Sequence, residues 1–178
     1  SNNSGNSYAD FLEDDYDVTV VKKAVSGTTL VEQGGSYISR MRSEISKNAK
    51  IDHLIVQLST NDASQNKPLG VCSDSFASGD QDTSTVIGAI EYIIAYAYET
   101  WGCDVTFWTN PWYANDNYAA MYNAIFQIQE KWDIGVLDYY ADGKPAEGTM
   151  SDDIHPNETG YRNMTPIAWE YLSNFKNG

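Results

Sequence analysis

The sequence Ile51-Asp52-His53-Leu54-Ile55-Val56-Gln57-Leu58 is followed at once by the polar run Ser59-Thr60-Asn61-Asp62. A short, largely apolar run that is rich in branched residues and bounded by polar ones is typical of a buried β-strand. In open parallel sheets, binding and catalytic residues gather at the carboxyl ends of the strands. The stretch therefore predicts a strand of such a sheet and, directly after it, a candidate functional turn.

Segments typical of strands and of helices alternate along the rest of the chain. Further strands are predicted over 17–25, 104–109 and 134–138, and helices over 7–13, 35–48, 83–101, 115–132 and 159–175. This alternation predicts an α/β domain with a parallel sheet and helices on both of its faces. A length of 178 residues suits one domain, and we expect residues 1–178 to form it.

A polar segment over residues 63–82 is predicted to be a long loop, because its proline, glycine, serine and aspartate residues disfavour regular structure. Loops of this length in compact domains are often functional. The segment contains Cys72, and Cys103 is the second of the two cysteines. Their spacing fits neither a zinc site nor a redox motif. A disulfide and a pair of unrelated thiols are both compatible with the sequence.

The overall charge limits the partners that the chain can bind. The formal net charge is −14 and the isoelectric point is about 4.2, which disfavours binding to nucleic acid or to anionic lipid. The sequence has no apolar run of the roughly 18–20 residues that a membrane span needs. Its polar start predicts no signal peptide there, whereas its Tyr-rich, Lys-poor composition favours a secreted or cell-surface protein. The sequence leaves the oligomeric state open.

The segment Asp152-Asp153-Ile154-His155-Pro156 contains one of the two histidines. A carboxylate three residues before an imidazole can orient that ring as a general base. Pro156 suits a position at the start of the helix that follows. The alternative is a surface turn that is stabilised by a capping acid. The other histidine, His53, lies at the start of a predicted strand, hence at the opposite edge of the sheet, and is expected to be structural or solvated.

Two further polar turns follow predicted strands and could stabilise an oxyanion. Gly27, in Ser26-Gly27-Thr28-Thr29, has no side chain, so its backbone N–H can approach a substrate oxygen closely. The side-chain amide of Asn61 is a second candidate donor. Each residue also has an ordinary interpretation: Gly27 as a turn glycine and Asn61 as a residue that caps the following loop.

The strand predicted at 104–109 leads into Asn110, Trp112 and Tyr113. These residues leave the sheet at the same edge as the candidate catalytic groups. We expect them to bind substrate by forming the wall of a pocket for a sugar or an acyl group. Packing beneath the long loop is the alternative, and for Trp108 it is the preferred one.

Three of these segments together resemble the SGNH (GDSL-type) hydrolases. They are Ser26-Gly27-Thr28-Thr29, Ser59-Thr60-Asn61-Asp62 and Asp152-Asp153-Ile154-His155-Pro156, and their order and spacing match three of the family's four sequence blocks. The resemblance implies a three-layer α/β/α fold with a flavodoxin-like parallel sheet. It also implies that Gly27 and Asn61 are oxyanion donors and that Asp152 and His155 belong to a Ser-His-Asp triad. No metal or organic cofactor is implied.

One block of that family, a strand followed by Gly-Asp-Ser that carries the nucleophile, is absent from residues 1–178. Either the natural protein has a further N-terminal piece, or another element takes the place of that central strand. We prefer the first interpretation and expect the nucleophilic serine to lie outside the sequence. Asp153 and Ser59 also stand where the family often has glycine, but neither change affects a reacting atom.

The expected function is a serine esterase that hydrolyses small acyl esters, for example acetyl esters, on a carbohydrate or another small polar molecule. The alternative is a non-catalytic carbohydrate-binding or adhesion domain derived from this fold. The absent serine favours that alternative, whereas the joint presence of Gly27, Asn61, Asp152 and His155 argues against it. A metal-dependent hydrolase that uses Asp62 with Asp152 and His155 is disfavoured, because a further histidine in range is lacking.

Overall fold

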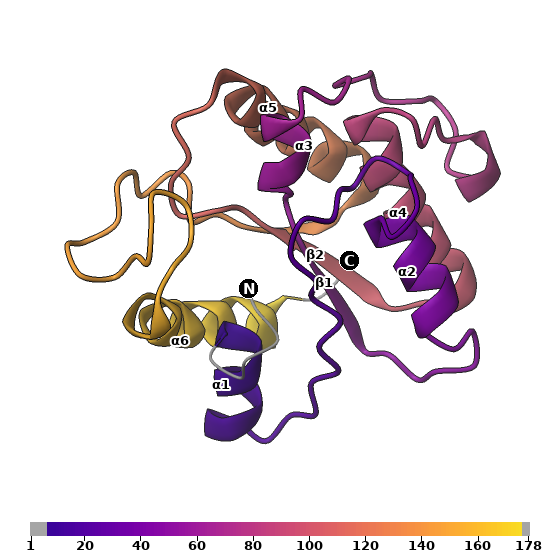
Figure 1. Ribbon diagram of the computed structural model, residues 1–178. Helices are drawn as coiled ribbons and strands as arrows, with labels where there is room; N and C mark the ends of the chain where they lie inside the picture. The colour runs from indigo at the N-terminus through magenta and orange to yellow at the C-terminus, as the bar shows by residue number, and fades with distance from the viewer. Residues whose placement is uncertain (1–6, 176–178) are drawn as a thin grey trace.

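The computed structural model describes residues 7–175. Its sheet has the strands β1 (His53–Gln57), β2 (Asp104–Trp108) and β3 (Gly135–Leu137), in the order β1-β2-β3 (Figure 1). All pairs are parallel: His53 is aligned with Asp104 at the start of β1, and Thr106 is aligned with Gly135 at the start of β3. The prediction of a parallel α/β sheet is therefore confirmed.

The five helices predicted from the sequence are confirmed, whereas α3 forms where a polar turn was predicted. The helices are α1 (Tyr8–Asp15), α2 (Tyr37–Glu44), α3 (Thr60–Ser64), α4 (Val86–Thr100), α5 (Asp116–Trp132) and α6 (Glu158–Asn174), with one 3-10 turn, η1 (Ser78–Asp80). The side chains of Thr85, Asn115 and Asn157 each accept a hydrogen bond from the first turn of the helix that follows. Within residues 7–175, the helices fall short of the length and apolar character that a membrane crossing requires.

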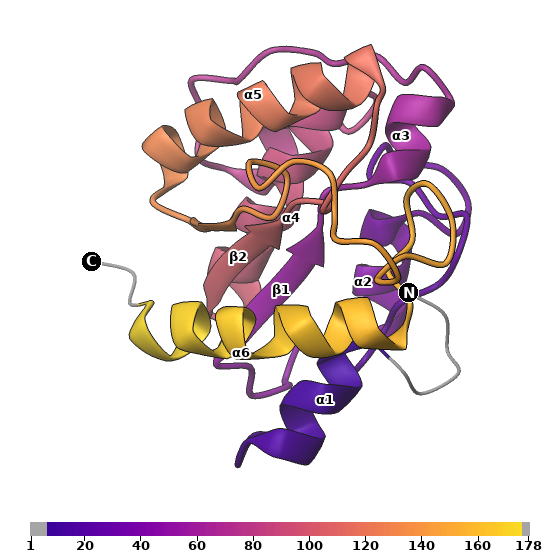
Figure 2. The same ribbon diagram turned by 90° about the vertical axis from the view of Figure 1, so that its left-hand side faces the viewer.

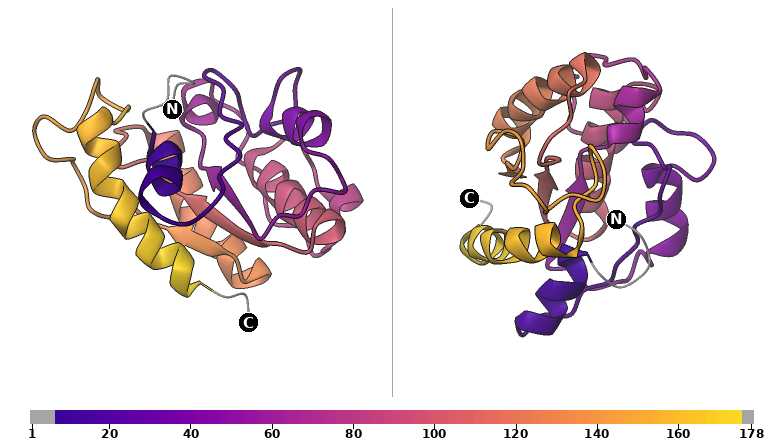
Figure 3. Two further views of the ribbon diagram at one scale, coloured as in Figure 1. Left: turned by 90° about the horizontal axis from the view of Figure 1, so that it is seen from below. Right: turned by 60° about the vertical axis from the view of Figure 1, so that its left-hand side comes forward.

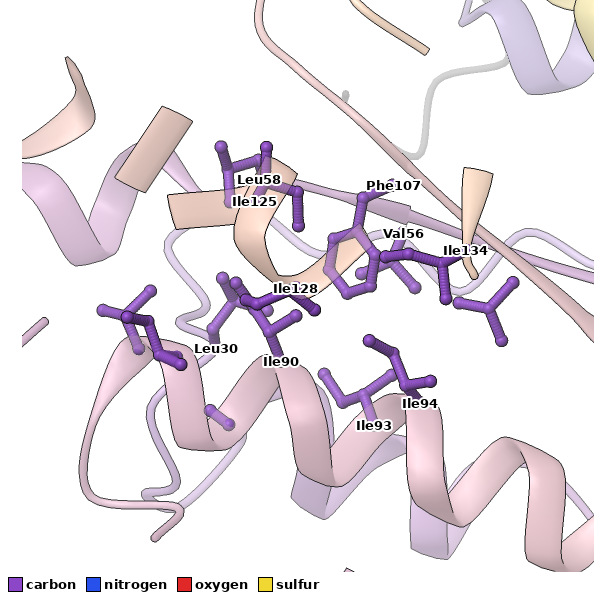
Figure 4. Packing of buried hydrophobic residues seen from close by; sticks show 14 of the residues in the cluster. Leu30, Val56, Leu58, Ile90, Ile93, Ile94, Phe107, Ile125, Ile128 and Ile134 are labelled. Atoms are coloured by element: carbon purple, nitrogen blue, oxygen red, sulfur yellow. The ribbon is translucent and has the colours of Figure 1, made fainter. Parts of the chain in front are cut away.

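Helices cover both faces of the sheet. On one face, Ile90 and Ile94 of α4 and Ile128 of α5 pack against Val56 and Phe107 of the strands (Figure 4). On the other face, α1 and α6 pack against Trp108 and Leu137, and Figure 2 shows α6 crossing in front of β1. Each of these large apolar side chains contributes about 1.5–3 kcal/mol when it is fully buried. The three-layer α/β/α architecture is thus built from two separate apolar clusters.

The strand predicted at 17–25 is not formed. These residues are extended, and their burial alternates, with Val20 half-buried and Val21 73% exposed. The segment is instead tied to α1: the backbone N–H of Val20 donates to Glu13, and Lys22 Nζ lies 2.7 Å from Asp10 Oδ1. The prediction was wrong because alternating residues indicate an extended chain with one buried side, not the presence of a neighbouring strand. Among the described residues, β1 is an edge strand (Figure 3, left).

The long loop predicted over residues 63–82 is confirmed apart from Ala63 and Ser64, which end α3, and the turn η1. A buried ion pair fixes this loop to the helices. Lys131 Nζ, on α5, lies 2.6 Å from Oε1 of Glu91 on α4 and donates to the carbonyl oxygens of Ser73 and Ser75 at 2.6 and 2.8 Å. The Glu91 carboxylate also accepts hydrogen bonds from the Ser73 backbone N–H and the Trp132 indole. The loop is thus anchored near its middle.

Both cysteines are free thiols. Cys103 is buried and Cys72, in the anchored loop, is partly exposed. Burial raises the pKa of the Cys103 thiol to about 11, so this group is a neutral part of the core. Of the two arrangements that the sequence allowed, the structure has the pair of separate thiols.

Candidate active site

Asp152 and His155 form a close pair on the loop that precedes α6. His155 Nδ1 lies 2.7 Å from Oδ2 and 2.9 Å from Oδ1 of Asp152. Both side chains are about half exposed, at 54% for His155 and 55% for Asp152. Among the described residues, Nε2 of His155 has no hydrogen-bond partner, so this nitrogen is open to a reacting group. The pair has the arrangement of a general base with its orienting carboxylate.

Asp152 also shapes the turn that holds the histidine. Its Oδ1 accepts hydrogen bonds from the backbone N–H groups of Ile154 and His155, at 2.9 and 2.8 Å. The hydrogen bond from Ile154, followed by that from the His155 ring, lowers the pKa of the Asp152 carboxyl. Asp152 therefore contacts the His155 ring, as the catalytic interpretation predicts, and also accepts hydrogen bonds from the backbone of the turn, as the capping alternative predicts.

The ends of this loop are joined to each other and to α6. Met150 and Pro156 form an antiparallel bridge, and Asn157 caps α6 while its Nδ2 donates to the carbonyl oxygen of Gly148. Gly160 lies so close to the loop that a Cβ at this position would come within 2.2 Å of the Thr149 carbonyl oxygen. Pro156 lies two residues before Glu158, the first residue of α6, rather than inside the first turn of this helix.

Gly27 and Asn61 are brought together in a second part of the site. Asn61, in α3 at the carboxyl end of β1, donates from Nδ2 to the carbonyl oxygen of Thr28 at 2.9 Å. Gly27 has a φ of +78°, a left-handed conformation that favours glycine, and a Cβ there would meet no described atom within 4 Å. The turn that carries Gly27 is thus joined to α3, which carries Asn61, although the segment before Gly27 is not a strand.

Asp62 is a further residue of this part of the site, and its structural role was missed in the sequence. It is buried, and its carboxylate accepts hydrogen bonds from the backbone N–H groups of Leu30 and Val31, at 2.7 and 3.0 Å. These bonds fix the segment after Gly27 to α3. Within residues 7–175 there is no group of three or more His, Cys, Asp or Glu side chains suited to hold a metal ion.

The two parts of the site do not touch. Among the described residues, Gly27 and Asn61 make no hydrogen bond to Asp152 or His155. In Figure 1 the orange loop that carries His155 is separated from the indigo segment between α1 and α2 that carries Gly27. The structure therefore assembles an acid–base pair and a pair of candidate donors, each held by its own contacts.

Trp112 and Tyr113 are partly exposed and belong to an aromatic cluster beside the site. The ring of Trp112 stacks on Tyr140 with 6.3 Å between centroids, and Tyr113 packs edge-on against Tyr118. A hollow of about 270 Å³ lies between the loop and α6, and Pro111, Met150, Pro156 and Ile167 are among its lining residues. These surfaces offer apolar walls beside the loop that carries His155.

Asn110 is buried, whereas the sequence predicted that it forms part of the wall of a pocket. It is 1% exposed, and its Nδ2 donates to the carbonyl oxygens of Trp112 and Ile154, at 2.8 and 2.9 Å. Both amide hydrogens are therefore used within the chain. His53 lies at the start of β1, as expected, where its Nε2 is 2.7 Å from Thr106 Oγ1.

The sequence model of the GDSL-like Lipase/Acylhydrolase family matches residues 1–162. The chain belongs to this family. It is accordingly an ester-hydrolysing enzyme, and the resemblance to the SGNH (GDSL-type) hydrolases is confirmed. No curated protein matches the chain.

Solved structures of GDSL proteins have the same fold as this GDSL-family chain. One, described as a lipolytic protein of the G-D-S-L family from Desulfitobacterium hafniense DCB-2, matches with a TM-score of 0.76 and 20% identity, over 96% of this chain and 90% of that one. A second, described as a GDSL-like lipase from Bacteroides uniformis ATCC 8492, matches with a TM-score of 0.61 and 17% identity, over 84% of this chain and 67% of that one. At these identities the similarity establishes the α/β/α fold.

Proposed function

We propose that this GDSL-family enzyme is a serine esterase in which His155 is the general base and Asp152 its orienting acid. The observation that carries the proposal is the 2.7 Å contact between His155 Nδ1 and Asp152 Oδ2, with Nε2 left open toward solvent. A carboxylate that holds Nδ1–H fixes the ring in the tautomer whose Nε2 can accept a proton. The proposed nucleophile is a serine hydroxyl that comes from outside the described residues.

In the first half of the reaction, the serine oxygen bonds to the ester carbonyl carbon while its proton passes to Nε2 of His155. The carbon–oxygen bond to the alcohol then breaks, and Nε2 returns the proton to the leaving alkoxide. In the second half, water gives a proton to Nε2 and bonds to the acyl carbon. The bond to the serine oxygen breaks, and that oxygen regains its proton. Asp152 stabilises the imidazolium at each stage.

The backbone N–H of Gly27 and the side-chain amide of Asn61 are the proposed donors to the oxyanion. Asn61 uses one amide hydrogen to hold Thr28, which leaves the second for a substrate oxygen. Asp62 holds the segment after Gly27 against α3, which carries Asn61, and this supports the role, because preorganised donors need no rearrangement when negative charge develops. In the proposed reaction, the bound substrate and the nucleophilic serine would lie between these donors and His155.

The proposed substrates are small acyl esters, for example acetyl esters, on a carbohydrate or another small polar alcohol. The partly exposed rings of Trp112 and Tyr113 support this, since aromatic faces pack well against sugar rings and acyl groups. We further propose that the protein is secreted or lies at the cell surface, in keeping with its acidic, Lys-poor composition.

The test is an assay of 4-nitrophenyl acetate hydrolysis by the full-length protein as its organism makes it, together with labelling by a fluorophosphonate. We expect turnover, one labelled serine identified by mass spectrometry, and loss of both in the His155→Gln variant. His53→Gln is the matched control, because it removes the other imidazole without touching the site.

Absence of both hydrolysis and labelling in the full-length protein would overturn the proposal. The non-catalytic carbohydrate-binding domain would then be the better interpretation, and retention on immobilised polysaccharide would support it. Labelling that persists unchanged in His155→Gln would assign the general base to another residue.

A further inference from the structure

We propose that Asn110 is a positioning residue that orients His155 by holding the peptide group between Ile154 and His155. The inference rests on the proposed function of His155, but its structural part stands on contacts that are independent of turnover. In this proposal Asn110 holds His155 in place, whereas the sequence predicted that Asn110 would contact the substrate.

The peptide group between Ile154 and His155 is held from both sides. Its carbonyl oxygen accepts a hydrogen bond from Asn110 Nδ2 at 2.9 Å, and its N–H donates to Asp152 Oδ1 at 2.8 Å. With both ends of the peptide plane fixed, the direction in which the His155 side chain leaves the backbone is fixed as well. The same carboxylate then holds the imidazole through Nδ1. Two residues thus determine both the backbone and the ring of His155.

Asn110 is itself held firmly at the carboxyl end of β2. Its backbone N–H donates to the Tyr118 hydroxyl at 2.6 Å, and its Oδ1 faces Gln57 Nε2 at 3.4 Å. Backbone hydrogen bonds between the strands continue up to this residue: Leu58 N–H donates to the Trp108 carbonyl oxygen, and Thr109 N–H donates to that of Leu137. Since Nδ2 faces two carbonyl oxygens and Oδ1 faces an amide N–H, the orientation of the side-chain amide is determined.

Other bonds of the His155 loop stay within the loop. Ser151 N–H donates to His155 O, and Asn157 binds Gly148 and Thr149. Among the described residues, the Asn110 amide is the hydrogen bond that joins residues 151–155 to the sheet. Internal bonds fix the shape of the loop, but only a bond to the sheet fixes where that shape lies relative to the strand ends. A misplacement of about 1 Å can lower turnover about 100-fold.

The test compares Asn110→Ala with Gln129→Ala. Gln129 is the matched control, because its side-chain amide also donates to a backbone carbonyl, that of Ile134, at the opposite end of the sheet. In Asn110→Ala we expect kcat to fall about 10–100-fold with KM changed less than about threefold, and hydrogen exchange of the Ile154 and His155 amides to rise at least about tenfold. Gln129→Ala should change neither quantity.

Asn110→Asp adds a readout that a merely structural role would not produce. An ionised carboxylate at this position would repel the two carbonyl oxygens, whereas its protonated form can donate one hydrogen bond. The kcat of this variant relative to that of the original protein should therefore rise as the pH is lowered.

Different results separate the two proposals. Unchanged exchange at Ile154 and His155 in Asn110→Ala would overturn the positioning role, whether or not the protein hydrolyses the ester. A rise in KM alone would also overturn it and would return Asn110 to substrate binding. Raised exchange without any turnover in the original protein would support the structural role and would count against the esterase.

Discussion

The Glu91–Lys131 and Asp152–His155 pairs have nearly equal lengths, 2.6 and 2.7 Å, but opposite surroundings. Glu91 is fully buried and Lys131 is 14% exposed, and every hydrogen of the ammonium group has an acceptor among Glu91, Ser73 and Ser75. In the other pair both side chains are about half exposed, and one imidazole nitrogen has no described partner.

The difference shows how one kind of contact serves two purposes. A pair whose donors and acceptors are all used can only hold elements together, and burial makes the loss of one member costly. A pair that keeps one nitrogen open can exchange a proton with a third group. On the proposed function, stability and reactivity are divided between these two pairs, and each prediction below tests that division.

The largest effect is expected for His155→Ala. Turnover of an ester substrate should fall by about 10⁴–10⁶-fold, because the proposed general base is lost. The midpoint of urea unfolding should stay nearly constant, because the side chain is half exposed and its partner remains solvated. Steady-state kinetics and urea unfolding of the same preparation measure both quantities. A large loss of stability would show that the exposed pair also holds the fold.

Lys131→Met should have the reverse effect. The free energy of unfolding should fall by about 3–5 kcal/mol, because Glu91 is left as an uncompensated buried charge. Turnover at a temperature where the variant is folded should be unchanged. Urea unfolding measures the loss, and the double variant Glu91→Gln/Lys131→Met, which removes both charges, should recover part of it. A loss below about 1 kcal/mol would contradict the proposed anchoring role.

The Asp10–Lys22 pair is intermediate in exposure and should show its contribution through pH. Burial alone would raise the pKa of the Asp10 carboxyl, but hydrogen bonds from Lys22 and Ser7 lower it from its usual 3.8 to about 2. Because the folded-state pKa is the lower one, the stabilisation is complete above about pH 4 and is lost as the pH falls through about 2. We expect about 1 kcal/mol, since the pair is screened by solvent.

The measurement for this third pair is the difference in unfolding free energy between the original protein and Asp10→Asn at several pH values. The difference should be present near pH 5 and shrink toward pH 2. A difference that is constant with pH would show that the hydrogen bonds at Asp10, rather than its charge, stabilise the contact.

The smallest effect is expected for Glu44→Gln, which weakens the pair between Arg40 and Glu44 on one face of α2. Ion pairs of this exposed i,i+4 type contribute about 0.3–0.5 kcal/mol. Unfolding in urea should therefore change by less than about 1 kcal/mol, and turnover should not change. A larger loss would indicate that Arg40 also needs this carboxylate in order to hold the Lys23 carbonyl oxygen, to which it donates at 2.7 Å.

Local sequence features predicted the parts of the structure whose partners are close in the chain. The apolar stripe of α4 repeats within a few residues, and Asp152 and His155, three residues apart, are in contact as predicted. The apolar runs of the three strands were likewise sufficient to locate them. In each case the deciding contacts lie within one element or one turn.

Features that depend on distant partners were not predicted. Residues 17–25 have the alternation of a strand but lack a neighbour in the described sheet. Asn110 was correctly predicted to follow a strand at the carboxyl end of the sheet. Its hydrogen-bond partner, the Ile154 carbonyl oxygen, was not predicted, because it lies 44 residues away in the chain. Glu91 left a signal that was overlooked: a charged residue inside the apolar stripe of α4 indicates a buried partner, here Lys131.

The parallel ladders also bear on how fast the molecule can form. His53 pairs with Asp104 and Thr106 with Gly135, so each ladder must close a segment of about 30–50 residues before it gains any pairing energy. Chains dominated by such non-local contacts fold in milliseconds to seconds rather than microseconds. The proposed site groups extend from Gly27 to His155, on both sides of these ladders in the chain, so we expect a refolding molecule to gain ester hydrolysis only after both ladders have closed.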